Sequence, residues 1–176
     1  MTMDDFEWLP AEQAKNHELV EGELIDVSGN TWDHNKLRDR LARLLAQIVL
    51  EHGLGEVITE QEYQFGSNAH GPDVTFVGTA KLPLHDPAKR VQRFVPDLAI
   101  EIVSQNDTMQ MLLRKKERYR ACGTQEVWII SQETAEVFIY SARGARILKG
   151  NDAIETDLIP GFSITVADLF HRLEQV

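Results

Sequence analysis

A carboxylate stands inside an apolar segment near the middle of the chain. Residues 95–103 form a near-continuous aliphatic run, which is typical of a strand covered on both faces. Because side chains alternate along a strand, Asp97 and Glu101 share one face and Leu98, Ile100 and Ile102 share the other. An unpaired carboxylate in such a place is costly or stays protonated. We therefore expect a metal ion, a lysine or an arginine close to Glu101.

The helix expected after this strand carries a basic residue on its apolar face. We predict that it begins at Asp107 and ends before Gly123. Positions spaced by ones, threes and fours share one side of a helix, and here they are Met111, Leu112, Lys115, Tyr119 and Cys122. Either Lys115 is aimed at the sheet, or it lays its stem on the core and keeps its ammonium in water. The pattern leaves both interpretations open.

A second acid, Asp73, opens an apolar strand over residues 71–77, although a turn aspartate is the ordinary interpretation of a Pro-Asp pair. With Glu101 and Lys115 it would place two carboxylates and an ammonium around one point. Oxygen ligands of this kind suit Mg²⁺ or Mn²⁺. Such an ion lowers the pKa of a bound water and neutralises phosphoryl charge, and a lysine stabilises the transition state. The chemistry indicated is hydrolysis of a phosphate ester.

The other segments predict the elements that position these residues. We expect a short helix capped by Thr2, two strand pieces within 18–27 that meet at Gly22, and an amphipathic helix over 31–52. Further strands are expected at 56–65, 126–130, 136–140 and 143–149, an irregular excursion at 78–94, and a final helix at 166–173. This order indicates an α/β fold, with a mixed central sheet flanked by helices.

Size and composition are those of one ordinary globular domain. The 176 residues contain no repeat or linker, so residues 1–176 are expected to form a single domain. The acidic N-terminus is unlike a targeting peptide, and the longest apolar region, residues 41–50, is too short to span a bilayer. The lone cysteine, Cys122, excludes an internal disulfide and a multi-cysteine zinc site. We therefore expect a cytoplasmic protein that does not contact a membrane.

The charge balance bears on the partner. The formal net charge is −10, which opposes binding to nucleic acid. The basic residues nevertheless gather in three groups, within 36–43, 89–93 and 114–120. Solvated surface is the ordinary interpretation of each group, and local positive patches are the alternative.

Several motifs occur in an order that resembles a known family. They are Pro72-Asp73, Glu101-Ile102-Val103, the set Lys115, Tyr119 and Gly123, and Glu126-Val127-Trp128. Together they are similar to the Uma family of restriction endonucleases, which belongs to the PD-(D/E)xK nuclease superfamily. The likeness extends from the acidic segment 18–23, through His34, to the end of the hairpin at residue 149.

The resemblance implies a restriction-endonuclease-like core and Mg²⁺-dependent cleavage of phosphodiester bonds. It implies Asp73 and Glu101 as metal ligands, with the backbone carbonyl of Ile102 as a third. The superfamily lysine normally lies two residues after the glutamate, where this chain has Val103, so the resemblance assigns that role to Lys115. Accessory roles are expected among Glu18, Glu23, His34, Asp97 and Tyr119, although a packed or surface histidine is the ordinary interpretation of His34. His70 stands where many relatives have an arginine.

These observations predict a nuclease that acts on DNA as a homodimer, because paired sites cut both strands most simply. The alternative is a catalytically inactive binding or assembly module of the same fold, which the acidic charge and Val103 favour. Hydrolysis of RNA or of a small phosphodiester is a third possibility.

Overall fold

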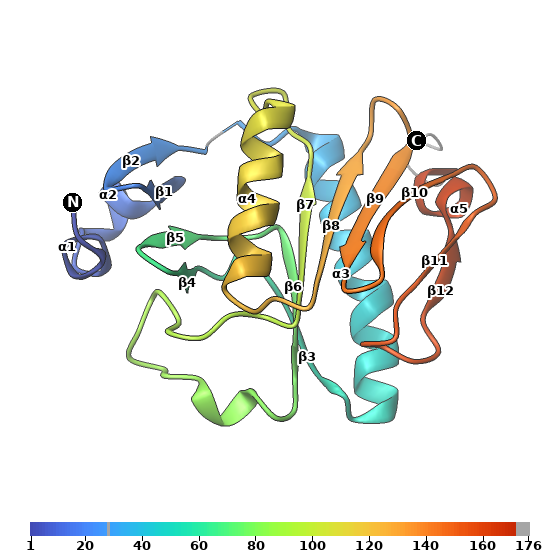
Figure 1. Cartoon of the computed structure of the whole chain (residues 1–176), viewed down its shortest axis with the longest axis horizontal. Helices are drawn as coiled ribbons and strands as arrows, with labels where there is room; N and C mark the ends of the chain where they lie inside the picture. Colours follow the sequence, from blue (N-terminus) through green and yellow to red (C-terminus); the bar gives the residue numbers. More distant parts are fainter. Residues whose placement is uncertain (28, 172–176) are drawn as a thin grey trace.

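The computed structural model describes residues 1–27 and 29–171 (Figure 1). Its largest element is a six-stranded sheet in the order β10-β9-β8-β7-β6-β3. The strands are β3 (Gly55–Thr59), β6 (Val74–Gly78), β7 (Leu98–Ile102), β8 (Glu126–Ser131), β9 (Glu136–Ser141) and β10 (Gly144–Lys149). Only β7 and β8 run parallel, and the other neighbours in this sheet are antiparallel. The predicted α/β fold with a mixed central sheet is confirmed.

Helices cover both faces of this sheet (Figure 1). One face is covered by α3 (Trp32–His52) and α5 (Val166–His171). The stripe of α3 formed by Leu37, Leu41 and Leu45 packs into the same core as Ile100 and Ile102. On the other face α4 (Met109–Ala121) packs Tyr119 with Ala99 and Val127. The two sets of side chains along β7 therefore divide between the faces as alternation predicts.

A second, four-stranded sheet lies at the N-terminal side, in the order β2-β1-β5-β4. Its strands are β1 (His17–Val20), β2 (Glu23–Asp26), β4 (Tyr63–Phe65) and β5 (Asn68–His70), and the helices α1 (Met3–Glu7) and α2 (Ala11–Ala14) precede it. Glu21 and Gly22 both have left-handed φ angles, 53° and 85°, and form the tight turn between β1 and β2. The turn predicted at Gly22 is confirmed.

Some boundaries differ from the sequence prediction. The strand expected over 56–65 is two strands in different sheets, because Glu60 takes a left-handed φ of 54° between them. The helix expected from Asp107 begins at Met109, because Thr108 caps it and Asp107 instead accepts hydrogen bonds from Ser104. The sequence prediction also missed α2, β5, the 3-10 helix η1 (Leu82–Leu84), and the pair β11 (Ala153–Glu155) and β12 (Ser163–Thr165).

Two further expectations concern the ends of helices and their length. The final helix was expected to reach residue 173, and residues 172 and 173 lie outside the described part of the chain. Within the described residues, no helix combines the length and the apolar character that crossing a bilayer requires.

Candidate active site

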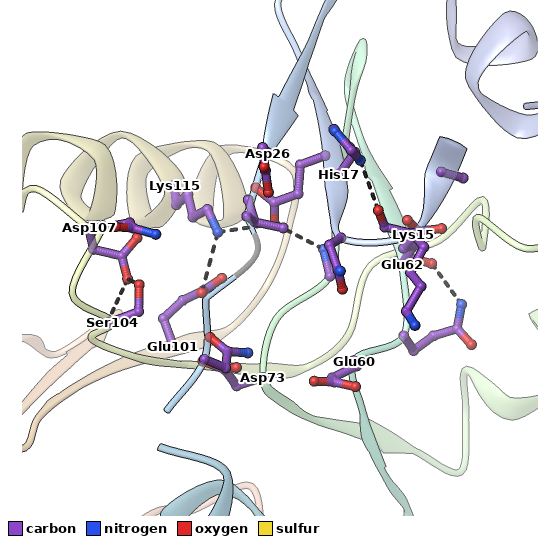
Figure 2. A pocket seen from close by; sticks show the side chains of 18 of the residues that line it. Lys15, His17, Asp26, Glu60, Glu62, Asp73, Glu101, Ser104, Asp107 and Lys115 are labelled. Atoms are coloured by element: carbon purple, nitrogen blue, oxygen red, sulfur yellow. Dashed lines mark hydrogen bonds and ion pairs between the residues drawn. The ribbon is translucent and has the colours of Figure 1, made fainter. Parts of the chain in front are cut away.

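A pocket of about 560 Å³ lies where β1, the end of β7 and the start of α4 meet. Its lining includes Glu18, Asp73, Glu101 and Lys115, which the sequence placed in or near the site. Figure 2 shows the side chain of Lys115 directed from α4 toward Glu101, with Asp73 on the other side of Glu101.

The two predicted metal-binding acids come from adjacent strands. The antiparallel register of β6 and β7 pairs Val74 with Ile100, so one step further Asp73 stands opposite Glu101. Residues opposite each other in an antiparallel pair point to the same face. Both acids are buried, and Oδ2 of Asp73 accepts a hydrogen bond of 2.7 Å from the backbone N–H of Ile102.

Lys115 points into the site. Its Nζ lies 3.0 Å from Oε1 of Glu18 and 3.4 Å from Oε2 of Glu101, and its side chain is 13% exposed. Of the two interpretations left open by the sequence, the structure shows the inward one. Met111, expected on the same buried face, is instead exposed at the edge of the pocket, and Cys122 is half-buried.

Tyr119 holds the other oxygen of Glu101. Its hydroxyl donates a 2.5 Å hydrogen bond to Oε1, and its fully buried ring stacks on Phe65 with the centroids 4.2 Å apart. Glu101 therefore has one oxygen fixed by a tyrosine and the other facing an ammonium. Both donors come from α4, one helical turn apart.

The site holds more carboxylates than cations. Burial raises the pKa of Glu101 to about 8, because the attraction of Lys115 is offset by repulsion from Asp73 and Glu18. Burial also opposes ionisation of Glu18, but Lys115 and His70 outweigh it and lower the pKa of Glu18 to about 2. Burial likewise disfavours a charged Lys115, yet the neighbouring glutamates raise the pKa of its ammonium above the ordinary value.

His34 lies beside these acids at the start of α3. Its Nε2 donates to the carbonyl of Ile102 at 3.0 Å and lies 3.4 Å from Oδ2 of Asp73. Burial disfavours the charged imidazole, but Asp73 and the carbonyl of Ile102 outweigh it and raise the pKa of His34. The buried Nδ1 has no hydrogen-bond partner among the described residues.

The donors present fit a hard divalent cation. Among the described residues, no three His, Cys, Asp or Glu side chains are grouped to hold an ion by themselves. Mg²⁺ is commonly bound through one or two carboxylates with several waters retained, which is what Asp73, Glu101 and the carbonyl of Ile102 can provide. The raised pKa of Glu101 means that burial and the neighbouring acids disfavour its ionised form, which a bound divalent cation would stabilise.

Two predicted accessory residues lie away from the pocket. Glu23 is exposed on β2. Asp97 is buried at the opposite end of β7 from the site, where it binds Lys81, the N–H of Gly78 and the amide of Gln125, each at 2.8 Å. Burial favours protonation of Asp97, but these partners outweigh it and lower its pKa.

The sequence prediction also missed two residues that reach the site. His70 contacts Glu18, and Arg118 contacts His70. The only signal for His70 was that it stands where many relatives have an arginine. Arg118 belongs to the basic group within 114–120, for which solvated surface was the ordinary interpretation. The contact of His70 with Glu18 arises from the pairing of β5 with β1, and that of Arg118 from the packing of α4, neither of which local patterns reveal.

A family model agrees with the motifs. The Uma2 model, described as "Putative restriction endonuclease", matches residues 3–167. The chain belongs to the Uma2 family. The resemblance recognised in the ordered motifs is therefore confirmed. No curated protein matches this Uma2 chain.

A solved structure shows the same fold. It is the crystal structure of "a putative nuclease belonging to DUF820" from Anabaena variabilis ATCC 29413. The TM-score is 0.88 at 21% sequence identity, and the match covers 98% of this Uma2 chain and 99% of the other. At this sequence identity the likeness shows the fold alone, and the fold is the one predicted, a mixed central sheet flanked by helices.

Proposed function

We propose that this Uma2 protein is a metal-dependent nuclease that hydrolyses phosphodiester bonds in DNA. The observation that carries the proposal is the convergence of Asp73, Glu101 and Lys115 on one pocket. Family membership supports the nuclease class, and the carboxylate surplus supports a divalent cation.

The residues divide the chemistry between them. Asp73, Glu101 and the carbonyl of Ile102 would hold Mg²⁺ or Mn²⁺, which when bound supplies charge neutralisation at the phosphate and a water of lowered pKa. In the reaction a water oxygen adds to phosphorus and the bond to the ester oxygen breaks, giving a phosphate monoester and an alcohol. The ammonium of Lys115 stabilises the extra negative charge of the transition state. Tyr119 keeps Glu101 oriented throughout.

The pocket also offers contacts for the phosphates that flank the scissile bond. Lys15, Lys89 and Arg90 line the same pocket as the acids. Arg90 is already paired with Glu62, which lines the same pocket, so Lys15 and Lys89 are the residues proposed to contact these phosphates.

Plasmid nicking in Mg²⁺ or Mn²⁺ tests the proposal. We expect Glu101→Gln and Lys115→Met each to lower the rate at least about 100-fold, the usual loss when a transition-state contact is removed. Glu126→Gln and Lys116→Met are matched controls, because Glu126 is a buried acid outside this pocket and Lys116 contacts Glu117 and Tyr140. EDTA is expected to stop the reaction. Undiminished nicking by both site variants would reject the proposal.

The same contacts favour a second candidate, a binding module without activity. Lys115 already pairs with Glu18 and Glu101 inside the folded chain, and Val103 occupies the superfamily lysine position. Calorimetric titration with Mn²⁺ separates the two candidates. Binding that Asp73→Asn abolishes supports the nuclease, and no binding to the wild-type protein supports the module.

We further propose that the protein works as a homodimer, because two symmetric sites cut a duplex most simply. Its proposed location is the cytoplasm. Sedimentation velocity at several protein concentrations checks the dimer. A monomer at all concentrations would contradict it.

A further inference from the structure

A fully buried histidine stands behind the glutamate that holds Lys115. His70 ends β5, is 0% exposed, and packs its ring against Phe65 and Tyr119 at centroid distances of 5.9 and 5.6 Å. Its Nδ1 lies 2.9 Å from Oε2 of Glu18, and its Nε2 lies 2.9 Å from a guanidinium nitrogen of Arg118. Both ring nitrogens are therefore engaged.

The chemistry of the two partners decides where the proton of the ring sits. A guanidinium only donates hydrogen bonds, so the Nε2 that faces Arg118 must offer a lone pair. The ring is then neutral with its proton on Nδ1, and this N–H donates to the carboxylate of Glu18. Burial, together with the charges of Lys115 and Arg118, lowers the pKa of His70 despite the opposing pull of Glu18, in agreement with a neutral ring.

The contacts of Glu18 transmit this arrangement to the lysine. Its Oε2 accepts from His70, while its Oε1 accepts from the N–H of Gly71 at 3.2 Å and from Nζ of Lys115 at 3.0 Å. The carboxylate cannot rotate without breaking all three contacts. The ammonium is thereby held between Glu18 and Glu101, 3.4 Å from the latter.

We propose that His70, locked by Arg118 as the Nδ1–H tautomer, is a positioning residue that fixes Glu18 and through it the ammonium of Lys115. The catalytic consequence rests on the proposed nuclease function, whereas the lock itself is a property of the folded chain. Without the His70 donor, Glu18 is held through Oε1 alone, by the N–H of Gly71 and by Lys115 itself. The ammonium is then less firmly placed and stabilises the transition state less well.

Nitrogen NMR of the metal-free protein, labelled with ¹⁵N in its histidine rings, tests the lock. The signal lost in His70→Asn identifies His70. We expect it to show a protonated Nδ1 and an unprotonated Nε2 at neutral pH. In Arg118→Met nothing requires a lone pair at Nε2, while Glu18 still accepts a hydrogen bond from Nδ1, so the signal is expected to move toward the doubly protonated ring. A protonated Nε2 in the wild-type protein, or an unchanged signal in Arg118→Met, would overturn the proposal.

Cleavage kinetics test the positioning role. His70→Asn keeps an amide donor near the place of Nδ1, whereas His70→Leu has none. We expect His70→Leu to lower kcat by about 10–100-fold with little change in KM, the usual effect of losing an outer partner of a functional group, and His70→Asn to restore most of the rate. The exposed His52, at the end of α3, provides the control variant His52→Leu.

The two experiments separate this inference from the proposed function. If the wild-type protein does not cleave DNA, the nuclease proposal fails while the NMR result still decides the lock. If the protein cleaves DNA and a folded His70→Leu is as fast as wild type, the positioning role is wrong and the nuclease proposal stands. If His70→Leu does not fold, His70→Phe takes its place in the kinetics, because it keeps an aromatic ring between Phe65 and Tyr119 but has no donor for Glu18. Full activity of a folded His70→Phe rejects the positioning role.

Discussion

Removing the hydroxyl of Tyr119 tests whether Glu101 ionises inside the folded protein. Tyr119→Phe keeps the ring that stacks on Phe65 and deletes only the donor that reaches Oε1 of Glu101 at 2.5 Å. Tyr63→Phe is a matched control, because Tyr63 is also fully buried and its hydroxyl bonds to the neutral hydroxyl of Thr75 at 2.9 Å. The two variants differ in the group that loses its partner.

The size of the effect depends on pH through Glu101. Burial raises the pKa of Glu101 from 4.5 to about 8, so between these values the folded chain binds a proton that the unfolded chain has released. The stability from this group is therefore present below about pH 4.5 and lost as the pH rises through about 8. Loss of a neutral hydrogen bond costs about 1 kcal/mol, and loss of one to a charged group costs about 1.5–3 kcal/mol. The loss in the free energy of unfolding caused by Tyr119→Phe is therefore expected to grow from about 1 kcal/mol at about pH 6 to about 1.5–3 kcal/mol at about pH 9.

Thermal unfolding followed by circular dichroism measures both variants across this pH range. For a chain of this size a loss of 1 kcal/mol lowers Tm by about 2–4 °C. We expect Tyr63→Phe to lower Tm by about 2–4 °C at every pH, because burial raises the pKa of Tyr63 to about 12 and it stays neutral. Tyr119→Phe should match it at about pH 6 and reach a loss of about 3–12 °C at about pH 9. Equal losses that do not vary with pH would refute the reasoning.

Two further substitutions test features outside the pocket. Asp97→Asn removes the charge that faces Lys81. Because the pKa of Asp97 is lowered in the folded chain, the stability that this carboxylate contributes is present above about pH 4 and is lost as the pH falls through its folded pKa. Urea unfolding should show a cost of about 1.5–3 kcal/mol at neutral pH and a smaller one at about pH 3, and a cost independent of pH would contradict this. Gly55→Ala places a Cβ 2.0 Å from the carbonyl oxygen of Val77 at a φ of 147°, so we expect it to cost at least about 3 kcal/mol in urea unfolding. Gly53→Ala, left-handed but in open space, should cost about 1–2 kcal/mol, and equal costs would contradict the clash.

Local periodicity placed Glu101 on its face of the sheet and Lys115 on the packed side of its helix, although it left two orientations open for the lysine. Alternation along residues 95–103 put Glu101 on the face opposite Ile100, and helical spacing put Lys115 on the face that also carries Tyr119. Both inferences hold because each concerns a single regular element. The ordered motifs then identified the family, which the matching model confirms.

Periodicity gives a face but not a distance, and this explains the misplaced Asp97. It shares the face of Glu101, yet four residues of extended chain span about 13 Å, so it serves a different cluster. Nor could local patterns find the contact of His70 with Glu18. That contact depends on pairing between β1 and β5, strands of four and three residues that are far apart in the sequence and too short for a periodic signal. The strand predicted over 56–65 failed for a related reason, since a left-handed residue at Glu60 leaves no mark in the apolar pattern.

Three hydrogen-bond donors in or behind the pocket come from little more than one turn of α4. They are Lys115, Arg118 and Tyr119. Because each residue advances a helix by about 100°, inserting or deleting one residue between 115 and 119 would send these side chains in diverging directions. The same change in the loop before the helix would leave their relative placement intact. Loss of function in a relative can therefore arise from a length change of one codon within this turn, with every acidic residue of the site still in place.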